Sequence, residues 1–337
     1  TATYDQAIAT YLQEQQTTFE SEKSEKETFF LSGKKIKTLR YGENPHQSAT
    51  WYQRGINASG WATSKILQGK ELSYNNLVDL EAARRIITEF SDAPTVAILK
   101  HTNPCGVAVD ETLLGAYEAA LAGDSVSAFG GIVALNKSID APTATAMTKT
   151  FLECVVAPGC EPEAEEIFQK KSKLRVLISP DLNQGESETI KVIAGGFLAQ
   201  DADNGVDNSS DWKIVTEKKP TTEQMEELMF AWKVVKHVKS NAIVVTKNRA
   251  TIGIGAGQMN RVGAVKIALE QAGEKAIGSV LASDAFFPFD DSVKTAAAAG
   301  ATAIIQPGGS LKDKDSIAAA NQLGLVMIFT GIRHFLH

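Results

Sequence analysis

Two stretches of this sequence repeat one order of segments: a branched apolar run, a polar turn, a helix-like segment and a second apolar run. The first begins with VAILKHTNPCG at Val96 and reaches SAFGGIVAL; the second begins with AIVVTKNRATIGIGAG at Ala242 and reaches LASDAFFPF. Apolar runs that alternate with helical segments are typical of α/β proteins, and a repeated order indicates an internal duplication. We therefore expect an α/β fold built from two similar subdomains.

A polar and acidic stretch lies between the two repeats, from about Asp181 to Asp211. We expect the division there, with a first subdomain over residues 37–200 and a second over residues 201–337. Residues 1–36 contain a helix-like start and then a charged run, ESEKSEKE, which is typical of a connector. Because ligands favour the junction between units, we expect the functional site between the two copies.

The composition is that of a globular protein, with 43% hydrophobic and 22% charged residues and no apolar run long enough to cross a membrane. A net charge of −6 disfavours nucleic-acid binding. Three cysteines, Cys105, Cys154 and Cys160, do not fit a disulfide framework or a zinc pattern, which favours a reducing compartment. The start at Thr1 shows neither an initiator methionine nor a signal-peptide pattern. We expect a cytoplasmic chain that is a piece of a longer protein.

Lys100 and His101 stand where a buried strand should end. The preceding run, Val96 to Leu99, is apolar and branched, and the Asn-Pro step that follows predicts a turn. Ligands of open α/β sheets bind at the carboxyl ends of strands, so a cation beside an imidazole is well placed for chemistry there. The alternative is a polar strand end that merely leaves the core.

Other polar residues gather where a ligand could bind. The motif RYGENPHQ, which begins at Arg40, brings arginine, tyrosine and histidine into one turn fixed by Asn-Pro. Gly130 allows a close approach of backbone to a ligand. Glu153 lies inside an apolar run, where a carboxylate needs a partner. Asn75 or Asn76 could cap the helix that follows.

Eight motifs occur in order along the chain: RYGENPHQ, LKHTNPCG, SAFGG, VVAPG, KSNAIVV, GIGAGQMNR, SDAFFPFDD and IRHFLH. Together they closely resemble AICAR transformylase, the formyltransferase domain of the bifunctional purine biosynthesis proteins, over residues 37–337. The resemblance implies two duplicated cytidine-deaminase-like subdomains, each a three-layer α/β/α unit, and a homodimer with sites across its interface.

The same resemblance implies an activity in purine biosynthesis. The formyl group of 10-formyltetrahydrofolate is transferred to the 5-amino group of AICAR, giving FAICAR and tetrahydrofolate. The family's IMP cyclohydrolase domain is missing from this chain, and we expect it to be fused N-terminally in the full-length protein. No cyclohydrolase activity is therefore expected from this chain alone.

Individual residues match the family's functional positions. Lys100, His101 and Asn241 match its catalytic residues. At position 153 the family commonly has aspartate where this chain has glutamate. The residues that match contacts with AICAR are Arg40, Tyr41, Asn76, Gly130, Glu153, Arg261, Asp291 and Arg333. Those expected near the folate are Val262, Phe286, Ser310 and Leu311.

Some members of the family hold a potassium ion beside the positions of Asp284 and Ser240. Here Ala242 and Leu336 stand where those members offer oxygen or imidazole side chains. The expectation of potassium therefore stays open, and no zinc or other metal is expected.

The chemistry of formyl transfer agrees with these residue types. The amine of AICAR is conjugated to its ring, and its attack on the formyl carbon creates an oxyanion and a surplus proton. An imidazole is the natural base, and like-charge repulsion from Lys100 would keep His101 neutral. Lys100 and Asn241 can donate to the oxyanion, while the forked guanidinium groups of Arg40 and Arg333 suit a phosphate. Whether Lys100 or His101 moves the proton stays open.

Two other functions compete with this interpretation. A zinc deaminase on the same fold would need His-x-Glu and Pro-Cys-x-x-Cys, and the sequence around Pro104-Cys105 lacks both patterns. A nucleotide-binding module without catalysis would explain the arginines but not Lys100 and His101 beside Asn241.

Overall fold

The computed structural model describes residues 4, 8, 29, 31–54, 57–183, 185–205 and 207–337. The connector predicted over residues 1–36 lies mostly outside the described residues. Its last residues belong to β1 (Gly33–Leu39), so the predicted boundary at residue 37 falls within a strand.

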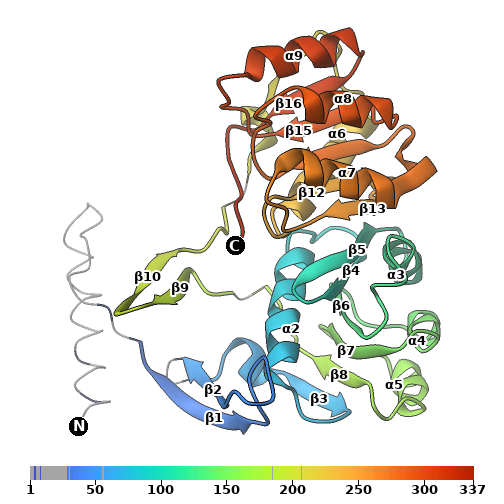
Figure 1. Ribbon diagram of the computed structural model, residues 1–337. Helices are drawn as coiled ribbons and strands as arrows, with labels where there is room; N and C mark the ends of the chain where they lie inside the picture. Colours follow the sequence, from blue (N-terminus) through green and yellow to red (C-terminus); the bar gives the residue numbers. More distant parts are fainter. Residues whose placement is uncertain are drawn as a thin grey trace.

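One mixed sheet of twelve strands runs through the described chain (Figure 1). Its order is β11-β16-β15-β14-β12-β13-β5-β4-β6-β7-β8-β3. The first half of the chain contributes β3 (Lys65–Gln68), β4 (Thr95–Lys100), β5 (Asn103–Val109), β6 (Gly131–Leu135), β7 (Leu152–Ala157) and β8 (Arg175–Ile178). The second half contributes β11 (Lys213–Ile214), β12 (Ile243–Lys247), β13 (Ala250–Gly255), β14 (Val280–Ser283), β15 (Ala303–Gln306) and β16 (Val326–Phe329).

The two halves of this sheet have the same internal order. Outward from the centre, β5-β4-β6-β7-β8-β3 corresponds to β13-β12-β14-β15-β16-β11. In both series the successive pairings are antiparallel, antiparallel, parallel, parallel and antiparallel. A single bridge, Ala108 to Ala250, joins the halves edge to edge. The predicted α/β class is confirmed, while the cytidine-deaminase-like duplication stays a prediction.

Helices cover both faces of the sheet. One face carries α2 (Tyr74–Ile87) and α6 (Thr222–Val235), which share a single apolar core that spans both halves. The other face carries α3 (Leu113–Leu121), α4 (Ala141–Met147) and α5 (Pro162–Gln169) over the first half, and α7 (Arg261–Ala272), α8 (Asp291–Ala298) and α9 (Asp313–Gln322) over the second. The shared core ties the halves together, since burial of apolar area is the main favourable term in folding.

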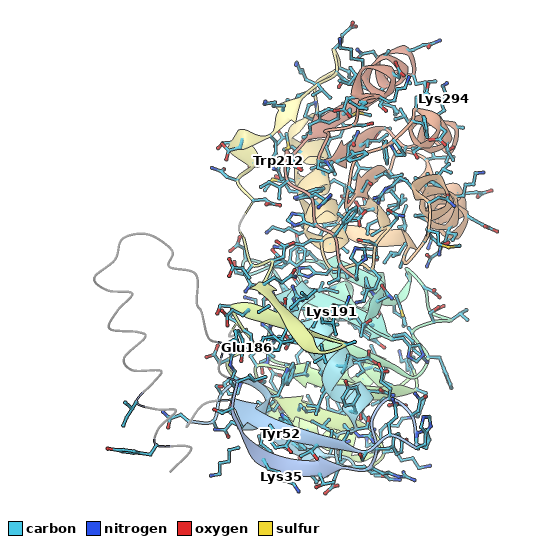
Figure 2. All side chains as sticks on the ribbon, turned by 60° about the vertical axis from the view of Figure 1, so that its left-hand side comes forward. Lys35, Tyr52, Glu186, Lys191, Trp212 and Lys294 are labelled. Atoms are coloured by element: carbon cyan, nitrogen blue, oxygen red, sulfur yellow. The ribbon has the colours of Figure 1, made fainter. Side chains whose placement is uncertain are left out.

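Two hairpins lie outside these layers (Figures 1 and 2). They are β1 with β2 (Ala49–Arg54), and β9 (Glu188–Ile193) with β10 (Gly196–Asp201). The second hairpin lies within the stretch that the sequence predicts to be a polar divider, and the predicted boundary at residue 200 falls inside β10. Short 3-10 helices at Gly60–Thr63, Ser209–Asp211 and Gly273–Ala276 complete the elements of the described chain.

Local signals predicted many of these elements. The helix expected over Leu113 to Leu121 is confirmed as α3, and the capping box of Thr221 with Gln224 is confirmed at the start of α6. The cap of α2 was expected at Asn75 or Asn76 and is Ser73, with Asn76 closing the box three residues later. Among the described helices, none has both the length and the apolar character that a membrane crossing needs.

Candidate active site

A two-residue turn presents His101 at the end of β4. His101 and Thr102 have φ of 51° and 65°, and β5 begins at once with Asn103. Two successive positive φ values are typical of a type I′ hairpin turn, which non-glycine residues adopt at a cost in strain. The expected turn at the Asn-Pro step is therefore wrong: the chain reverses two residues earlier, and Pro104 lies in β5 beside a register shift, where proline is tolerated.

Asp79, on α2, holds this turn in place. Its Oδ1 accepts a hydrogen bond of 2.7 Å from the backbone N–H of Thr102. Burial raises the pKa of Asp79 above its usual value, although the Thr102 N–H and the neighbouring His101 act in the opposite direction. The exposed imidazole of His101 is thus carried on a turn that a half-buried carboxyl anchors.

Lys100 and Gly130 lie close together. The Lys100 Nζ donates a hydrogen bond of 2.5 Å to the carbonyl of Phe129, and Gly130 has a φ of 71°. A Cβ built on Gly130 would lie 3.1 Å from the Lys100 Nζ. Glycine is therefore needed here twice, for its backbone conformation and for the space that the ammonium group occupies.

The nucleotide-binding candidates of the first half meet at the start of α2. Asn76 donates from Nδ2 to Glu153 Oε2 at 3.1 Å, and Asn75 donates to the carbonyl of Glu43 at 3.3 Å. The latter contact brings the loop of Arg40 and Tyr41 to the same helix end. Glu153 was expected to be buried within its strand; it is exposed at the start of β7, and its partner is Asn76.

A second cluster forms around Asn241. Its side chain accepts a hydrogen bond of 2.8 Å from Arg261 and donates one of 2.7 Å to the carbonyl of Gln258. Arg261 is buried and also pairs with Asp284, whose carboxylate is fully buried. Burial lowers the pKa of Arg261, and the Asp284 charge opposes that shift. Arg261, predicted to contact AICAR, lies here as the neighbour that orients Asn241.

One hydrogen bond connects the two clusters. Asn103 Oδ1 accepts from the backbone N–H of Lys239 at 3.1 Å. Asn103 follows His101 by two residues and Lys239 precedes Asn241 by two, so the three predicted catalytic residues come from segments that touch. The contact lies where the start of β5 meets the segment between α6 and β12.

The C-terminal tail, residues 330–337 after β16, lies beside the cluster around Asn241. Ser240 and Leu336 exchange two hydrogen bonds, from the Ser240 N–H to the Leu336 carbonyl at 2.9 Å and from the Leu336 N–H to Ser240 Oγ at 3.0 Å. The guanidinium of Arg333 lies 4.4 Å from the centre of the Phe335 ring and is exposed. The tail therefore holds Arg333 near the residues that surround Asn241.

The remaining candidates are less closely gathered. Val262 follows Arg261 at the start of α7, and Phe286 lies two residues beyond Asp284, with part of its ring exposed. Asp291 begins α8, where it accepts from the N–H of Ser292. Ser310 and Leu311 belong to the turn before α9, and no described contact joins that turn to the catalytic candidates.

Hydrogen-bond donors and a cationic side chain surround the carboxylate of Asp284. Its carboxylate accepts hydrogen bonds from Ser240 Oγ at 2.5 Å and from the Ala242 N–H at 3.1 Å, and it faces the cationic Arg261. Potassium at this position stays a prediction. In the described ranges, no group of three or more His, Cys, Asp or Glu side chains could hold a metal ion.

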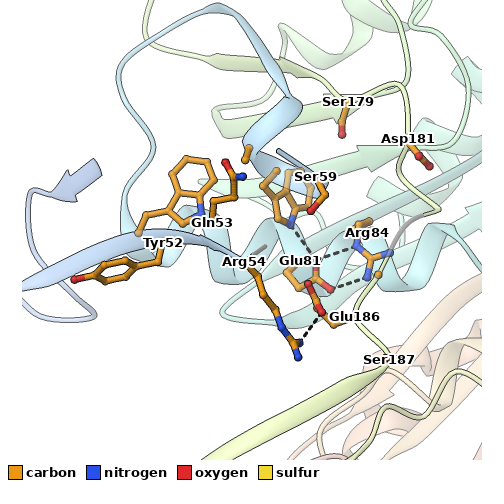
Figure 3. Close-up of a pocket in the computed structure, with 15 residues that line it drawn as sticks. Tyr52, Gln53, Arg54, Ser59, Glu81, Arg84, Ser179, Asp181, Glu186 and Ser187 are labelled. Carbon is orange, nitrogen blue, oxygen red and sulfur yellow. Dashed lines mark hydrogen bonds and ion pairs between the residues drawn. The ribbon is translucent and has the colours of Figure 1, made fainter. Parts of the chain in front are cut away.

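A hollow of about 360 Å³ lies elsewhere, between β2, α2 and residues 179–187 (Figure 3). Its lining contains two ion pairs, Arg54 with Glu186 at 2.8 Å and Arg84 with Glu81 at 2.6 Å, and the carboxylate of Asp181. Because both arginines of this lining are paired with carboxylates, we do not place the candidate active site in this hollow.

Sequence reasoning missed the positioning roles of Asp79, Asn103 and Lys239. Asn103 and Lys239 lie within the motifs LKHTNPCG and KSNAIVV, whereas Asp79 matches no motif. The internal repeat could have found Asp79. In the second half, Glu227 on α6 accepts from the N–H of Arg249 at 2.7 Å, and Asn248 and Arg249 form the corresponding turn with φ of 56° and 52°. One arrangement therefore anchors both hairpins, and only the first carries the lysine–histidine pair.

Known proteins of one family match this chain. A family model described as AICARFT/IMPCHase bienzyme matches residues 1–271. The chain belongs to this family. Its relatives include proteins named bifunctional purine biosynthesis protein PurH, from Trichodesmium erythraeum at 89% identity over 337 residues, from Rippkaea orientalis at 68% over 338 residues and from Nostoc punctiforme at 66% over 337 residues. All of this chain is covered in each comparison, and it spans 65% of each relative's length.

Proposed function

We propose that this chain catalyses the formyltransferase reaction of its family, from 10-formyltetrahydrofolate to the 5-amino group of AICAR. Membership of the bienzyme family supports a role in purine biosynthesis. The observation that supports the finer proposal is the Asn103–Lys239 hydrogen bond, because it joins the segment that carries His101 to the segment that carries Asn241.

The proposed reaction exchanges one C–N bond for another. The AICAR nitrogen attacks the formyl carbon, and the carbonyl oxygen becomes an oxyanion. The oxyanion then collapses, the bond from the carbon to N10 of the folate breaks, and N10 gains the proton that the amine has lost. The products are FAICAR and tetrahydrofolate, so atoms and charge balance without an added reductant or oxidant.

The donors that remain free suit the oxyanion. An ammonium group has three N–H bonds, and Lys100 uses one of them for the Phe129 carbonyl. The Asn241 amide has two, and one serves the Gln258 carbonyl. These contacts hold both side chains in place, and each side chain still has an N–H group that can donate to the oxyanion. Such preorganised donors contribute roughly 3 kcal/mol each to transition-state stabilisation.

The proton transfer is assigned to the pair of Lys100 and His101. His101 is exposed on its anchored turn, which lets a ligand reach the ring. A general base typically contributes about 10²- to 10⁴-fold to the rate. Arg40 and Arg333, exposed on their loops, are the proposed partners of the nucleotide phosphate.

Further proposals follow from the family alone. We propose a homodimer in the cytoplasm, and we assign the cyclohydrolase activity that the family description names to the part of the relatives that this chain does not cover. Sedimentation of the purified chain tests the first: a fully active monomer would contradict it. A cyclohydrolase assay on FAICAR tests the last, and turnover by this chain would contradict it.

A spectrophotometric assay with AICAR and 10-formyltetrahydrofolate tests the main proposal. Turnover that depends on both substrates, and that Lys100→Ala and His101→Ala each abolish or strongly reduce, is expected. Binding of AICAR without turnover in the full-length protein would overturn it.

A further inference from the structure

Glu89 joins the two halves of the chain through a polar contact that is largely shielded from water. It follows α2 by two residues, and its carboxylate accepts a hydrogen bond of 2.9 Å from the His237 ring and pairs with the Lys236 ammonium at 3.1 Å. Both partners come directly after α6, and only 6% and 5% of their side chains are exposed. The backbone carbonyl of Glu89 also accepts a hydrogen bond of 2.8 Å from Lys233.

The charges of this contact are matched. Burial would raise the pKa of Glu89, but the bonds from His237 and Lys236 outweigh that effect and lower the pKa, so the carboxylate is ionised. Burial lowers the pKa of His237, although Glu89 acts in the opposite direction. The neutral ring therefore donates its Nε2 hydrogen, and Lys236 supplies the counter-charge. Because removal of one partner would leave a shielded charge uncompensated, this contact holds both helix ends firmly.

The two members of the contact occupy corresponding positions of the two halves. Asp79 and Glu227 anchor the corresponding turns of the first and second half. Glu89 follows Asp79 by ten residues, and His237 follows Glu227 by ten. Corresponding positions that touch each other lie where the two units meet. The contact between Glu89 and His237 therefore fixes how one unit is placed against the other.

Both sides of this contact lead to the candidate active site. On one side, α2 carries Asp79, which anchors the turn of His101. On the other side, the chain continues from His237 to Asn241 within four residues. A displacement between the ends of α2 and α6 would therefore change the distance between His101 and Asn241.

Glu89 acts on this distance from outside the site. The candidate AICAR contact of α2 is Asn76, at the start of the helix, and eleven residues separate it from Ile87, the last residue of α2. This separation corresponds to a rise of about 16 Å along the helix axis, and Glu89 lies beyond Ile87. A role for Glu89 in the reaction is therefore one of positioning.

We propose that Glu89 is a positioning residue for formyl transfer, which sets the distance between the turn of His101 and Asn241. The inference rests on the proposed function and adds to it a residue that acts through the junction of the two halves. Small displacements of a catalytic group can cost about 10²-fold in rate, so kcat should depend on this junction more than AICAR affinity does.

A double-mutant cycle in the full-length protein tests this role. Glu89→Gln keeps the size of the side chain but removes the counter-charge of Lys236, and it should lower kcat roughly tenfold with a change of less than about threefold in the AICAR KM. In the Asn241→Ala background the same substitution should change kcat less than about twofold, because the group that it displaces is absent. A merely structural role would give the same fold loss of kcat in both backgrounds.

Three further variants complete the design. Glu89→Asp keeps the charge and should keep kcat within about threefold of the unaltered protein. Glu81→Gln is the matched control, since Glu81 pairs with Arg84 inside α2 and does not join the halves; its kcat should stay within about twofold. His237→Ala leaves the ion pair with Lys236 in place, and it takes the place of Glu89→Gln in the cycle where that protein does not fold.

Each other outcome overturns a defined statement. Equal fold losses of kcat in the two backgrounds would assign Glu89 to stability alone and overturn the inference. A folded Glu89→Gln protein with the kcat of the unaltered protein, or with a larger loss of AICAR affinity than of kcat, would overturn it as well. In these cases the unaltered protein still transfers the formyl group. No turnover in the unaltered protein would overturn the proposed function, and the inference with it.

Discussion

Asp79 accepts a hydrogen bond of 2.7 Å from the backbone of Thr102, the residue that follows His101. This contact crosses from a helix on one face of the sheet to the turn at the end of β4. It keeps two non-glycine residues at positive φ, a conformation that persists only where the surroundings impose it. The position of the candidate base therefore depends on a residue of α2, outside its own hairpin.

Asp79→Ala should lower turnover by roughly tenfold or more, because small displacements of a catalytic group can cost about 10²-fold. Glu227→Ala is the matched control, since Glu227 anchors the corresponding turn of the second half. Loss of a hydrogen bond to a charged group costs about 1.5–3 kcal/mol of stability, and both variants should show it in thermal unfolding. Equal turnover in the two variants would contradict a role for Asp79 in placing His101.

Gly130→Ala should reduce kcat, because the new methyl group would meet the Lys100 ammonium. The control is Gly195→Ala, on the β9–β10 turn. Gly195 also has a positive φ, of 79°, but nothing lies within 4 Å of its added Cβ. Backbone strain of about 1 kcal/mol is expected in both. If the two variants lose turnover alike, strain rather than the contact with Lys100 is responsible.

Sequence reasoning predicted the elements well where one periodic signal dominates. The buried strand at β4 and the helix from about Leu113 to Leu121 were predicted from local patterns, and both are confirmed. The turn after β4 was placed too late, because Asn-Pro is a stronger turn signal than His-Thr. Only the long-range contact from Asp79 makes the earlier turn favourable, and no local pattern reports such a contact.

The sequence predicted which residues belong to the candidate site, as separate motifs, but it did not predict how these residues are arranged in space. The sequence supplied Lys100, His101 and Asn241, and the structure adds the contact of Asn103 with Lys239 that relates them. Burial was the least predictable property. Glu153 was expected to be buried and is exposed, whereas Arg261, expected at a ligand, is buried against Asp284. Both outcomes depend on tertiary neighbours.

Stability at alkaline pH should depend on His334. Its ring, buried in the tail, bonds Asp203 at 2.6 Å and Asp207 at 2.8 Å, and Trp232 also donates to Asp207. Burial alone would lower the pKa of His334, but the two carboxylates overcome it and raise that pKa to about 9. The protonated form is thus favoured in the folded state.

The direction of this pH dependence follows from the difference between the pKa of His334 in the folded state and its pKa in the unfolded state. The unfolded imidazole has a pKa of about 6.5, so the stabilisation is complete below that pH and is lost as pH rises through about 9. The melting temperature should fall by several degrees between pH 7 and 10. In His334→Gln, which cannot become protonated, it should start lower and depend less on pH over this range. Parallel pH curves for the two proteins would contradict this account.

Arg333→Ala should weaken AICAR binding by roughly 10- to 100-fold, as loss of a charge-assisted phosphate contact does. Binding of the folate should change little. Calorimetry measures both dissociation constants, and Lys239→Ala serves as a control for the tail, because the Lys239 ammonium bonds the His337 carbonyl. An unchanged dissociation constant for AICAR would show that Arg333 does not belong to the nucleotide site.

The central claim is that Lys100 and His101 carry out formyl transfer with Asn241. The decisive measurement is kcat for AICAR and 10-formyltetrahydrofolate in His101→Ala, beside its thermal unfolding and its affinity for AICAR. The account predicts a stable protein with near-normal AICAR binding and a kcat reduced by about 10²- to 10⁴-fold. A stable His101→Ala protein with near-normal turnover would contradict it.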